Sequence, residues 1–133
     1  MTRSSFLLII CCSFFLSGYS QDAFKSLAEQ DVKSLLCHKW NLSFLEGMGK
    51  KISVPGKSPQ LLLEFVKDGT LNEKAGKKSY TGKWSYNHDT RVITTNDQDG
   101  KEEYTIVNIS DVVLVIRNKF KGVIVNLGMQ RVN

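Results

Sequence analysis

Cysteine, proline and histidine are scarce in this chain of 133 residues, which holds three, two and two of them. Two of the cysteines fall in the apolar N-terminal segment, so Cys37 has no partner for an intramolecular disulfide once that segment is removed. We expect a fold held together by its core, with Cys37 as a small buried residue. After residue 20, no apolar run is long enough to cross a bilayer, so no stable membrane span is expected.

The N-terminus has the features of a cleavable signal peptide over residues 1–20. Arg3 precedes an apolar run at residues 6–16, and small residues at the end of the segment fit cleavage after Ser20. The run is shorter than the roughly 20 residues that span a bilayer. We therefore expect one secreted or periplasmic domain over residues 21–133.

The cysteines in this segment raise the alternative of a lipid anchor. Lipoprotein processing needs a small residue before the modified cysteine, but Ile10 precedes Cys11. Free secretion is therefore favoured over lipid anchoring.

The charge balance is moderately basic, at a formal +5. A charge of this size mainly keeps a small domain soluble. Lysines at positions 74, 77, 78 and 83 surround one expected hairpin and would suit an anionic surface, although a solvated loop is favoured. The aromatic residues next to these lysines, Tyr80 and Trp84, are placed inside by the alternation, so nucleic acid is not an expected partner.

Residues 22–36 keep a helical rhythm. The apolar residues of this segment recur at three- and four-residue spacing, while charged residues fall on the other side. They are Phe24, Leu27, Ala28, Val32 and Leu35. Asp22 is a suitable N-cap. We predict a short amphipathic helix that docks on one open end of the rest of the fold.

From Trp40 to Met129, apolar and polar residues alternate in short runs separated by turn residues. This period of two is typical of half-buried antiparallel strands. The segment Glu46–Pro59 is rich in glycine, lysine and proline and is expected to be the longest loop. We predict an all-β fold, an eight-stranded antiparallel up-and-down barrel with a short N-terminal helix.

Three motifs follow one another along these strands. Trp40 stands in the first strand, Phe65-Val66-Lys67-Asp68-Gly69-Thr70 runs through a turn, and Gly82-Lys83-Trp84 follows. Their order over residues 36–131 resembles the lipocalin-like proteins of the calycin group, especially the short exported bacterial kind. The resemblance implies a closed barrel, whereas function varies within the group.

In lipocalins the first strand opens with Gly-x-Trp, and His38 stands here in place of the glycine. The resemblance implies that Trp40 plugs the closed end of the barrel and that an arginine of the last strand covers it. Arg131 shares the parity of the inward residues of that strand, so its guanidinium is expected over Trp40.

The alternation also places a set of apolar side chains inside the barrel as candidate ligand-binding residues. Such a lining suits a small apolar or amphipathic ligand, and Gly82 leaves space beside Trp84. The alternative is a squat barrel that its own side chains fill completely. The candidates are Phe44, Phe65, Tyr80, Trp84, Tyr86, Tyr104, Leu114 and Ile116.

The sequence assembles no catalytic or metal-binding constellation. Cys37 and His38 are neighbours on a strand and point to opposite faces, and His88 lies in a polar turn. The run Asp97-Gln98-Asp99-Gly100 lacks the first and last carboxylates of a calcium loop. We expect no enzyme activity, no cofactor and no metal.

Two functions are consistent with these features. The first is an exported, non-catalytic binding protein for a small apolar or amphipathic ligand. The alternative is a protein-interaction module, such as a secreted protease inhibitor, with a side-chain-filled barrel. Its contact surface would be the helix at residues 22–36 or the loop Glu46–Pro59.

Overall fold

The structure is a computed structural model that describes residues 23–54 and 61–133. The expected signal peptide, the proposed cap Asp22 and residues 55–59 of the expected loop lie outside the described residues. Within the described part of the chain, no helix has the length and apolar character needed to cross a membrane.

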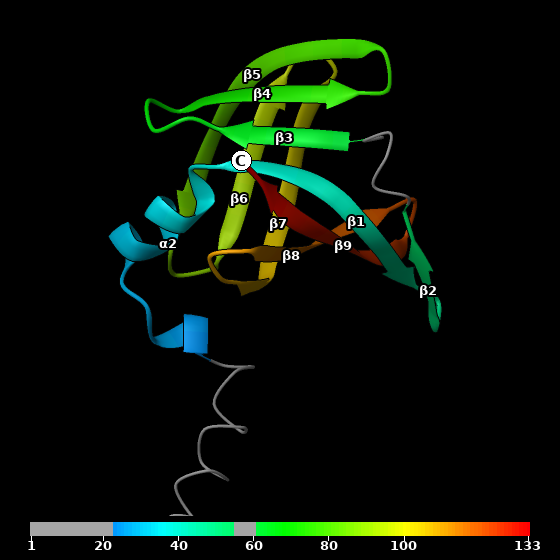
Figure 1. The fold of residues 1–133 in the computed structure, drawn as a ribbon, viewed down its shortest axis with the longest axis horizontal. Helices are drawn as coiled ribbons and strands as arrows, with labels where there is room; N and C mark the ends of the chain where they lie inside the picture. The colour runs from blue at the N-terminus through cyan, green and yellow to red at the C-terminus, as the bar shows by residue number, and fades with distance from the viewer. Residues whose placement is uncertain (1–22, 55–60) are drawn as a thin grey trace, which may run out of the picture.

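A closed antiparallel β-barrel forms most of the molecule (Figure 1). The strands follow one another around the sheet, and pairing of the first with the last closes it. The second and third strands pair with successive parts of the first, so nine strands fill eight positions and the predicted eight-stranded barrel is confirmed. The strands are β1 (Lys39–Gly47), β2 (Lys50–Ser53), β3 (Leu61–Phe65), β4 (Thr70–Ala75), β5 (Lys78–Asn87), β6 (Val92–Asp97), β7 (Gly100–Ile109), β8 (Val113–Phe120) and β9 (Val123–Val132).

The expected loop at Glu46–Pro59 is wrong in its first half. Glu46 and Gly47 complete β1, and β2 returns antiparallel to it. The two turn residues Met48 and Gly49 have φ angles of 52° and 75°, as in the tight turns that fit the twist of a hairpin. Gly47, Gly49, Lys50 and Lys51, which contributed to the expectation of a loop, belong to this hairpin.

The predicted helix divides into two pieces. A 3₁₀ turn, η1 (Ala23–Ser26), is followed by α2 (Glu29–Leu36), and Ala28 between them is extended with a ψ of 159°. The bend at Ala28 lets both pieces reach one end of the barrel, because Phe24 is buried along with residues of α2.

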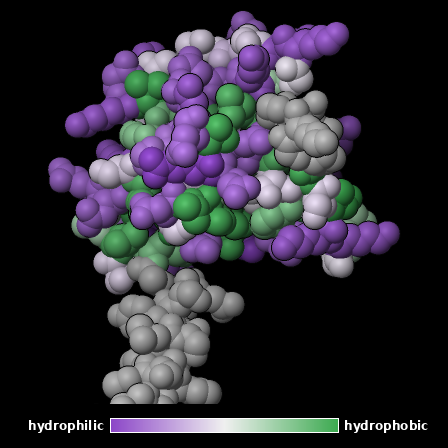
Figure 2. Space-filling model, viewed as in Figure 1, coloured by the Kyte–Doolittle hydropathy of each residue, from purple (hydrophilic) through white to green (hydrophobic). Residues whose placement is uncertain are grey.

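The core runs from this helical segment into the barrel without interruption. Trp40 is fully buried, and its indole N–H donates to the carbonyl oxygen of Leu36 at 3.0 Å. The last carbonyl of α2 is thereby tied to the base of β1. On the surface, hydrophobic and hydrophilic residues intermix, and long hydrophilic side chains project from the edge of the view (Figure 2). The buried hydrophobic residues are Phe24, Val32, Leu36, Trp40, Leu42, Leu63, Phe65, Leu71, Trp84, Tyr86, Ile93, Ile106, Ile109, Leu114, Ile116 and Met129.

Candidate functional site

Most of the predicted ligand-binding residues form part of the packed core. They are at most 9% exposed, and Tyr104 packs against them while Tyr80 is half-buried. Such burial means that these side chains contact one another and leave little surface for a ligand. The buried members of the predicted set are Phe65, Trp84, Tyr86, Leu114 and Ile116.

Gly82 does not leave the space that the sequence suggested. A Cβ added there would overlap the carbonyl oxygen of Asn96 and lie 2.9 Å from the Cβ of Asp97. Strand β6 occupies this position, and glycine is required because the backbones approach closely. The missing side chain of Gly82 therefore adds no space to the barrel interior.

Phe44 lies on the outer face of the barrel, whereas the alternation predicted an inward position. The register of β1 on β9 shifts between Leu42 and Phe44, so Phe44 pairs with Gly128 and Leu45 pairs with the inward Leu127. Such a bulge inverts the parity of the strand beyond it. The Phe44 ring covers Gly128 from outside, and the Lys51 ammonium lies 4.3 Å from its centroid.

Arg131 lies directly opposite Trp40 in the register of β1 and β9, as the motif predicted. Its guanidinium, however, is exposed and donates to the carbonyl oxygen of Asp111 at 3.4 Å. Burial of Trp40 is supplied by the core and by the last turn of α2. That the Trp40 and Arg131 pair closes the barrel stays a prediction.

Acidic side chains gather at the end of the barrel away from α2. Glu73 on β4 is half-buried, and its pKa is raised by burial and by Asp97, with which it shares a side-chain hydrogen bond. Burial also raises the pKa of Tyr104 to about 12, helped by Glu102 and by these two carboxylates. Burial first, and then repulsion by Asp97, therefore favour the protonated form of the Glu73 carboxyl.

Replacing this glutamate, as Glu73→Gln, should raise the thermal stability at neutral pH. The pKa of Glu73 is raised in the folded state above its ordinary value of 4.5. The protonated carboxyl therefore contributes stability that is fully present below about pH 4.5 and is lost as the pH rises through the raised pKa. Melting temperatures of the two proteins should therefore coincide near pH 4 and diverge by a few degrees at pH 7. The exposed neighbour Glu103, as Glu103→Gln, serves as the control. An equal gain at all pH values would contradict the explanation.

A cleft of about 740 Å³ lies between α2 and the barrel wall. From α2 it receives residues at the spacing i, i+3, i+4 and i+7, which places them on one face of the helix. The barrel supplies the β3–β4 turn and the end of β5. Its size is in the range of small-molecule sites. The lining residues are Gln30, Lys33, Ser34, Cys37, Lys67, Asp68, Gly69, Trp84, Ser85 and Tyr86.

Hydrogen bonds hold the floor of this cleft in place. The Trp84 indole N–H donates to the carbonyl oxygen of Val66 at 2.8 Å, and its ring packs edge-on against Phe65. The Asp68 carboxylate accepts from the backbone N–H of Thr70 at 2.9 Å, and hydrogen bonds from Thr70 lower its pKa. The cleft thus combines an aromatic floor with fixed polar groups on one wall.

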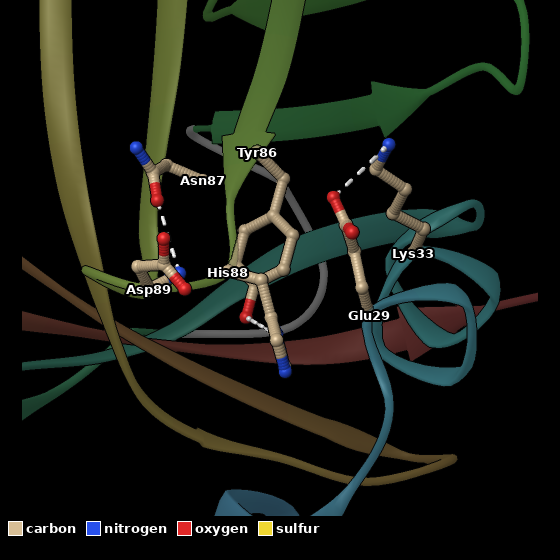
Figure 3. A network of polar contacts seen from close by, with 6 residues as sticks. All are labelled: Glu29, Lys33, Tyr86, Asn87, His88 and Asp89. Atoms are coloured by element: carbon tan, nitrogen blue, oxygen red, sulfur yellow. Dashed lines mark hydrogen bonds and ion pairs between the residues drawn. The ribbon is translucent and has the colours of Figure 1, made fainter.

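A second hollow of about 510 Å³ shares Ser85 and Tyr86 with this cleft. Figure 3 shows the polar contacts around it: the Tyr86 hydroxyl lies 3.1 Å from His88 Nδ1, and Lys33 pairs with Glu29 at 3.7 Å. Burial raises the pKa of the Tyr86 phenol. The side-chain oxygen of Asn87, also in Figure 3, accepts the backbone N–H of the second residue after it, which fixes the turn.

The thiol of Cys37 lines the cleft. Burial raises the pKa of the Cys37 thiol more than Lys67 and Lys33 lower it, so the nucleophilic thiolate is disfavoured. Burial likewise lowers the pKa of His38, whose ring lies edge-on to Trp40. Among the described residues, no group of three or more metal-binding side chains comes together.

The sequence did not single out the lysines of this cleft. Lys33 and Ser34 carry a recognisable signal, because they lie on one face of α2 with Gln30 and Cys37. Lys67 gives no such signal, since only the closed barrel brings the β3–β4 turn beside the helix.

Comparisons with known proteins agree with this architecture. A family model described as "Lipocalin-like domain" matches residues 36–116. A lipocalin-like protein from Bacteroides uniformis ATCC 8492 superposes with a TM-score of 0.57 at 15% identity, over 73% of this chain and 98% of that one. A DUF4847 family protein from Bacteroides vulgatus ATCC 8482 gives a TM-score of 0.50 at 12% identity, over 72% and 95%. No curated protein matches the chain.

Proposed function

The chain belongs to the lipocalin-like domain family, and we propose that it is an exported, non-catalytic binding protein for a small amphipathic molecule. The ligand carries an anionic group and occupies the cleft between α2 and the end of β5. The barrel core serves as a scaffold for this cleft.

One observation carries the proposal: a cleft of about 740 Å³ places two lysines over an aromatic floor. Lys33 of the helix forms an exposed ion pair with Glu29, and Lys67 comes from the β3–β4 turn. An anionic group between the two lysines competes with Glu29 for Lys33 and contacts both elements. The small exposed parts of Trp84 and Tyr86, which are 9% and 7% accessible, line the cleft and offer the apolar part of a ligand its contact. Most side chains that were predicted to line a ligand site inside the barrel are already buried against one another. The cleft is therefore also the more suitable site for the apolar part of a ligand.

Titration with 1-anilinonaphthalene-8-sulfonate, a fluorescent amphipathic anion, tests the proposal. The double variant Lys33→Gln/Lys67→Gln should bind the dye about tenfold more weakly, because it loses two cationic contacts at a partly exposed site. Ser34→Trp, which fills the cleft from α2, should abolish saturable binding.

Matched controls lie elsewhere on the surface. The double variant Lys77→Gln/Lys78→Gln, in the hairpin between β4 and β5, removes two exposed charges, and Ser79→Trp adds an indole to an exposed position of β5. Both should bind the dye as the natural protein does. Unchanged affinity in the Lys33→Gln/Lys67→Gln variant, or loss in a control instead, would reject the cleft as the site.

A protein-interaction role is the second candidate, and the filled core is the observation that favours it. A packed barrel needs no small molecule, and α2 exposes Asp31, Lys33 and Ser34 while it buries Val32 and Leu36. In this case the protein inhibits a secreted protease without binding the dye, and Ser34→Trp relieves the inhibition.

A further inference from the structure

Two hairpins lie side by side at the end of the barrel away from α2 (Figure 1). Glu46 on β1 pairs with Asn126 on β9, and a Cβ added at Gly47 would lie 3.2 Å from the carbonyl oxygen of Ile124. The β1–β2 turn and the β8–β9 turn therefore share one edge of the barrel. Residues 48–52 and 119–124 are called the hairpin tip below.

The hairpin tip exposes large apolar side chains that are between 37% and 85% accessible. Soluble domains expose single hydrophobic residues routinely, but gathered ones mark an interaction surface. Elsewhere in the described part of the chain, Val112 and Val132 are the exposed large hydrophobic residues. The apolar residues of the tip are Met48, Ile52, Phe120, Val123 and Ile124.

Lysines surround these apolar residues. Lys50, Lys51, Lys119 and Lys121 are all exposed. Between described residues, no ion pair involves these four lysines, while the Lys51 and Lys121 ammonium groups lie over the Phe44 and Phe120 rings. The carboxylates beside the tip are Glu46, which accepts a hydrogen bond from the Asn126 amide at 3.2 Å, and Glu102 of the acidic cluster, which accepts one from the Asn118 amide at 3.2 Å.

The apolar side chains lie on both faces of the ribbon. Phe120 pairs with Val123 and shares its strand face with the buried Ile116, whereas Ile124 pairs with Lys119 on the opposite face. A rigid protein surface covers one face of such a ribbon, whereas the interface of a bilayer surrounds both. The arrangement therefore favours a lipid surface over a protein partner.

Both turns carry an uncommon residue at their apex. Met48 and Lys121 occupy the first turn position with φ angles of 52° and 50°, where asparagine, aspartate or glycine is usual. The apices thus hold an apolar and a cationic side chain at positions that tolerate them poorly.

We propose that the hairpin tip docks the protein on anionic lipid bilayers. Met48, Phe120 and Ile124 enter the headgroup boundary, and the four lysines contact acidic headgroups. Apolar burial combined with charge attraction is the general basis of interfacial binding.

Cosedimentation of the exported protein with phosphatidylcholine vesicles containing 30% phosphatidylserine is the first test. The exported chain is used with its N-terminus determined by mass spectrometry. Binding should fall by about fivefold for each of Lys50→Gln and Lys121→Gln, and strongly in pure phosphatidylcholine or high salt. The matched charge control is Lys39→Gln, at the other end of β1. Equal losses in Lys39→Gln would overturn the assignment to the tip.

Met48→Asn separates docking from folding. Asparagine suits the turn better than methionine, so this variant should keep or raise the melting temperature while it weakens vesicle binding. Val112→Asn, which removes an exposed apolar residue from the opposite end, should bind vesicles normally. Normal vesicle binding by Met48→Asn would argue against insertion of the apex.

A site-specific probe reports the depth of the tip. Phe120→Trp should show a blue-shifted emission with vesicles and quenching by brominated lipids, whereas Val112→Trp should show neither. Quenching at position 112 alone would place the membrane contact at the other end. If neither position is quenched, the bilayer proposal fails and a protein partner takes its place. Dye binding in the α2 cleft is unaffected by these outcomes.

Discussion

Replacing the buried indole at the base of the barrel, as Trp40→Ala, should lower the free energy of unfolding by about 3–5 kcal/mol. Trp40 is fully buried, and its indole N–H donates to the carbonyl oxygen of Leu36 at 3.0 Å. The variant loses the packing of a large ring and one of the bonds that tie α2 to the barrel. Urea unfolding followed by circular dichroism measures the change.

Two further variants separate the contributions of the ring, the indole N–H and Arg131 to this loss of stability. Trp40→Phe keeps an aromatic ring but removes the N–H, and it should cost less than alanine. Arg131→Ala should change stability by no more than about 0.5 kcal/mol, because its guanidinium is exposed. A loss in Arg131→Ala as large as that in Trp40→Ala would instead mean that the arginine closes the barrel as the motif predicts.

The same contact explains why the helical segment is part of the domain. Val32 and Leu36 are fully buried, and Phe24 joins them in the core. Arg91 at the β5–β6 turn donates to the carbonyl oxygen of Lys25 at 2.7 Å and lies over the Phe24 ring. Removing this segment would expose the base of the barrel, so its functional role is best tested by substitutions on its exposed face.

Sequence patterns predicted the barrel because most strands keep a strict period of two. In β5, Trp84 and Tyr86 are buried and the residues between and beside them are exposed, as alternation requires. The helical period likewise identified the segment that contains α2, and Val32, one of the residues on which the prediction rested, is buried there. In both cases the pattern is local, and each element carries its own evidence.

Features that depend on contacts between distant segments were missed. The bulge before Phe44 inverts the strand, and a residue count along β1 contains no sign of it. The space expected beside Gly82 is filled by β6, which only the register reveals. About 30 residues separate Lys67 from α2 in the chain. They meet in one cleft only because the barrel closes.

Adding a single methyl group on the outside of the barrel, as Gly128→Ala, should destabilise the protein by about 1–3 kcal/mol. The added Cβ would lie inside the Phe44 ring, which packs directly on the Gly128 backbone. Aromatic cover of a strand glycine is known to stabilise sheets. The ring must leave its place between Gly128 and Lys51, and its contacts are lost with it.

The double variant Phe44→Ala/Gly128→Ala tests this cause. Once the ring is gone, the methyl group of alanine has space, so Gly128→Ala should cost much less in the Phe44→Ala background than in the natural protein. A coupling free energy of at least about 1 kcal/mol, obtained from urea unfolding of the four proteins, would establish the contact. Additive effects would mean that the Phe44 ring does not cover Gly128 and that it points into the barrel, as strict alternation predicts. The bulge in β1 therefore decides whether this ring contributes to the outer surface or to a ligand site.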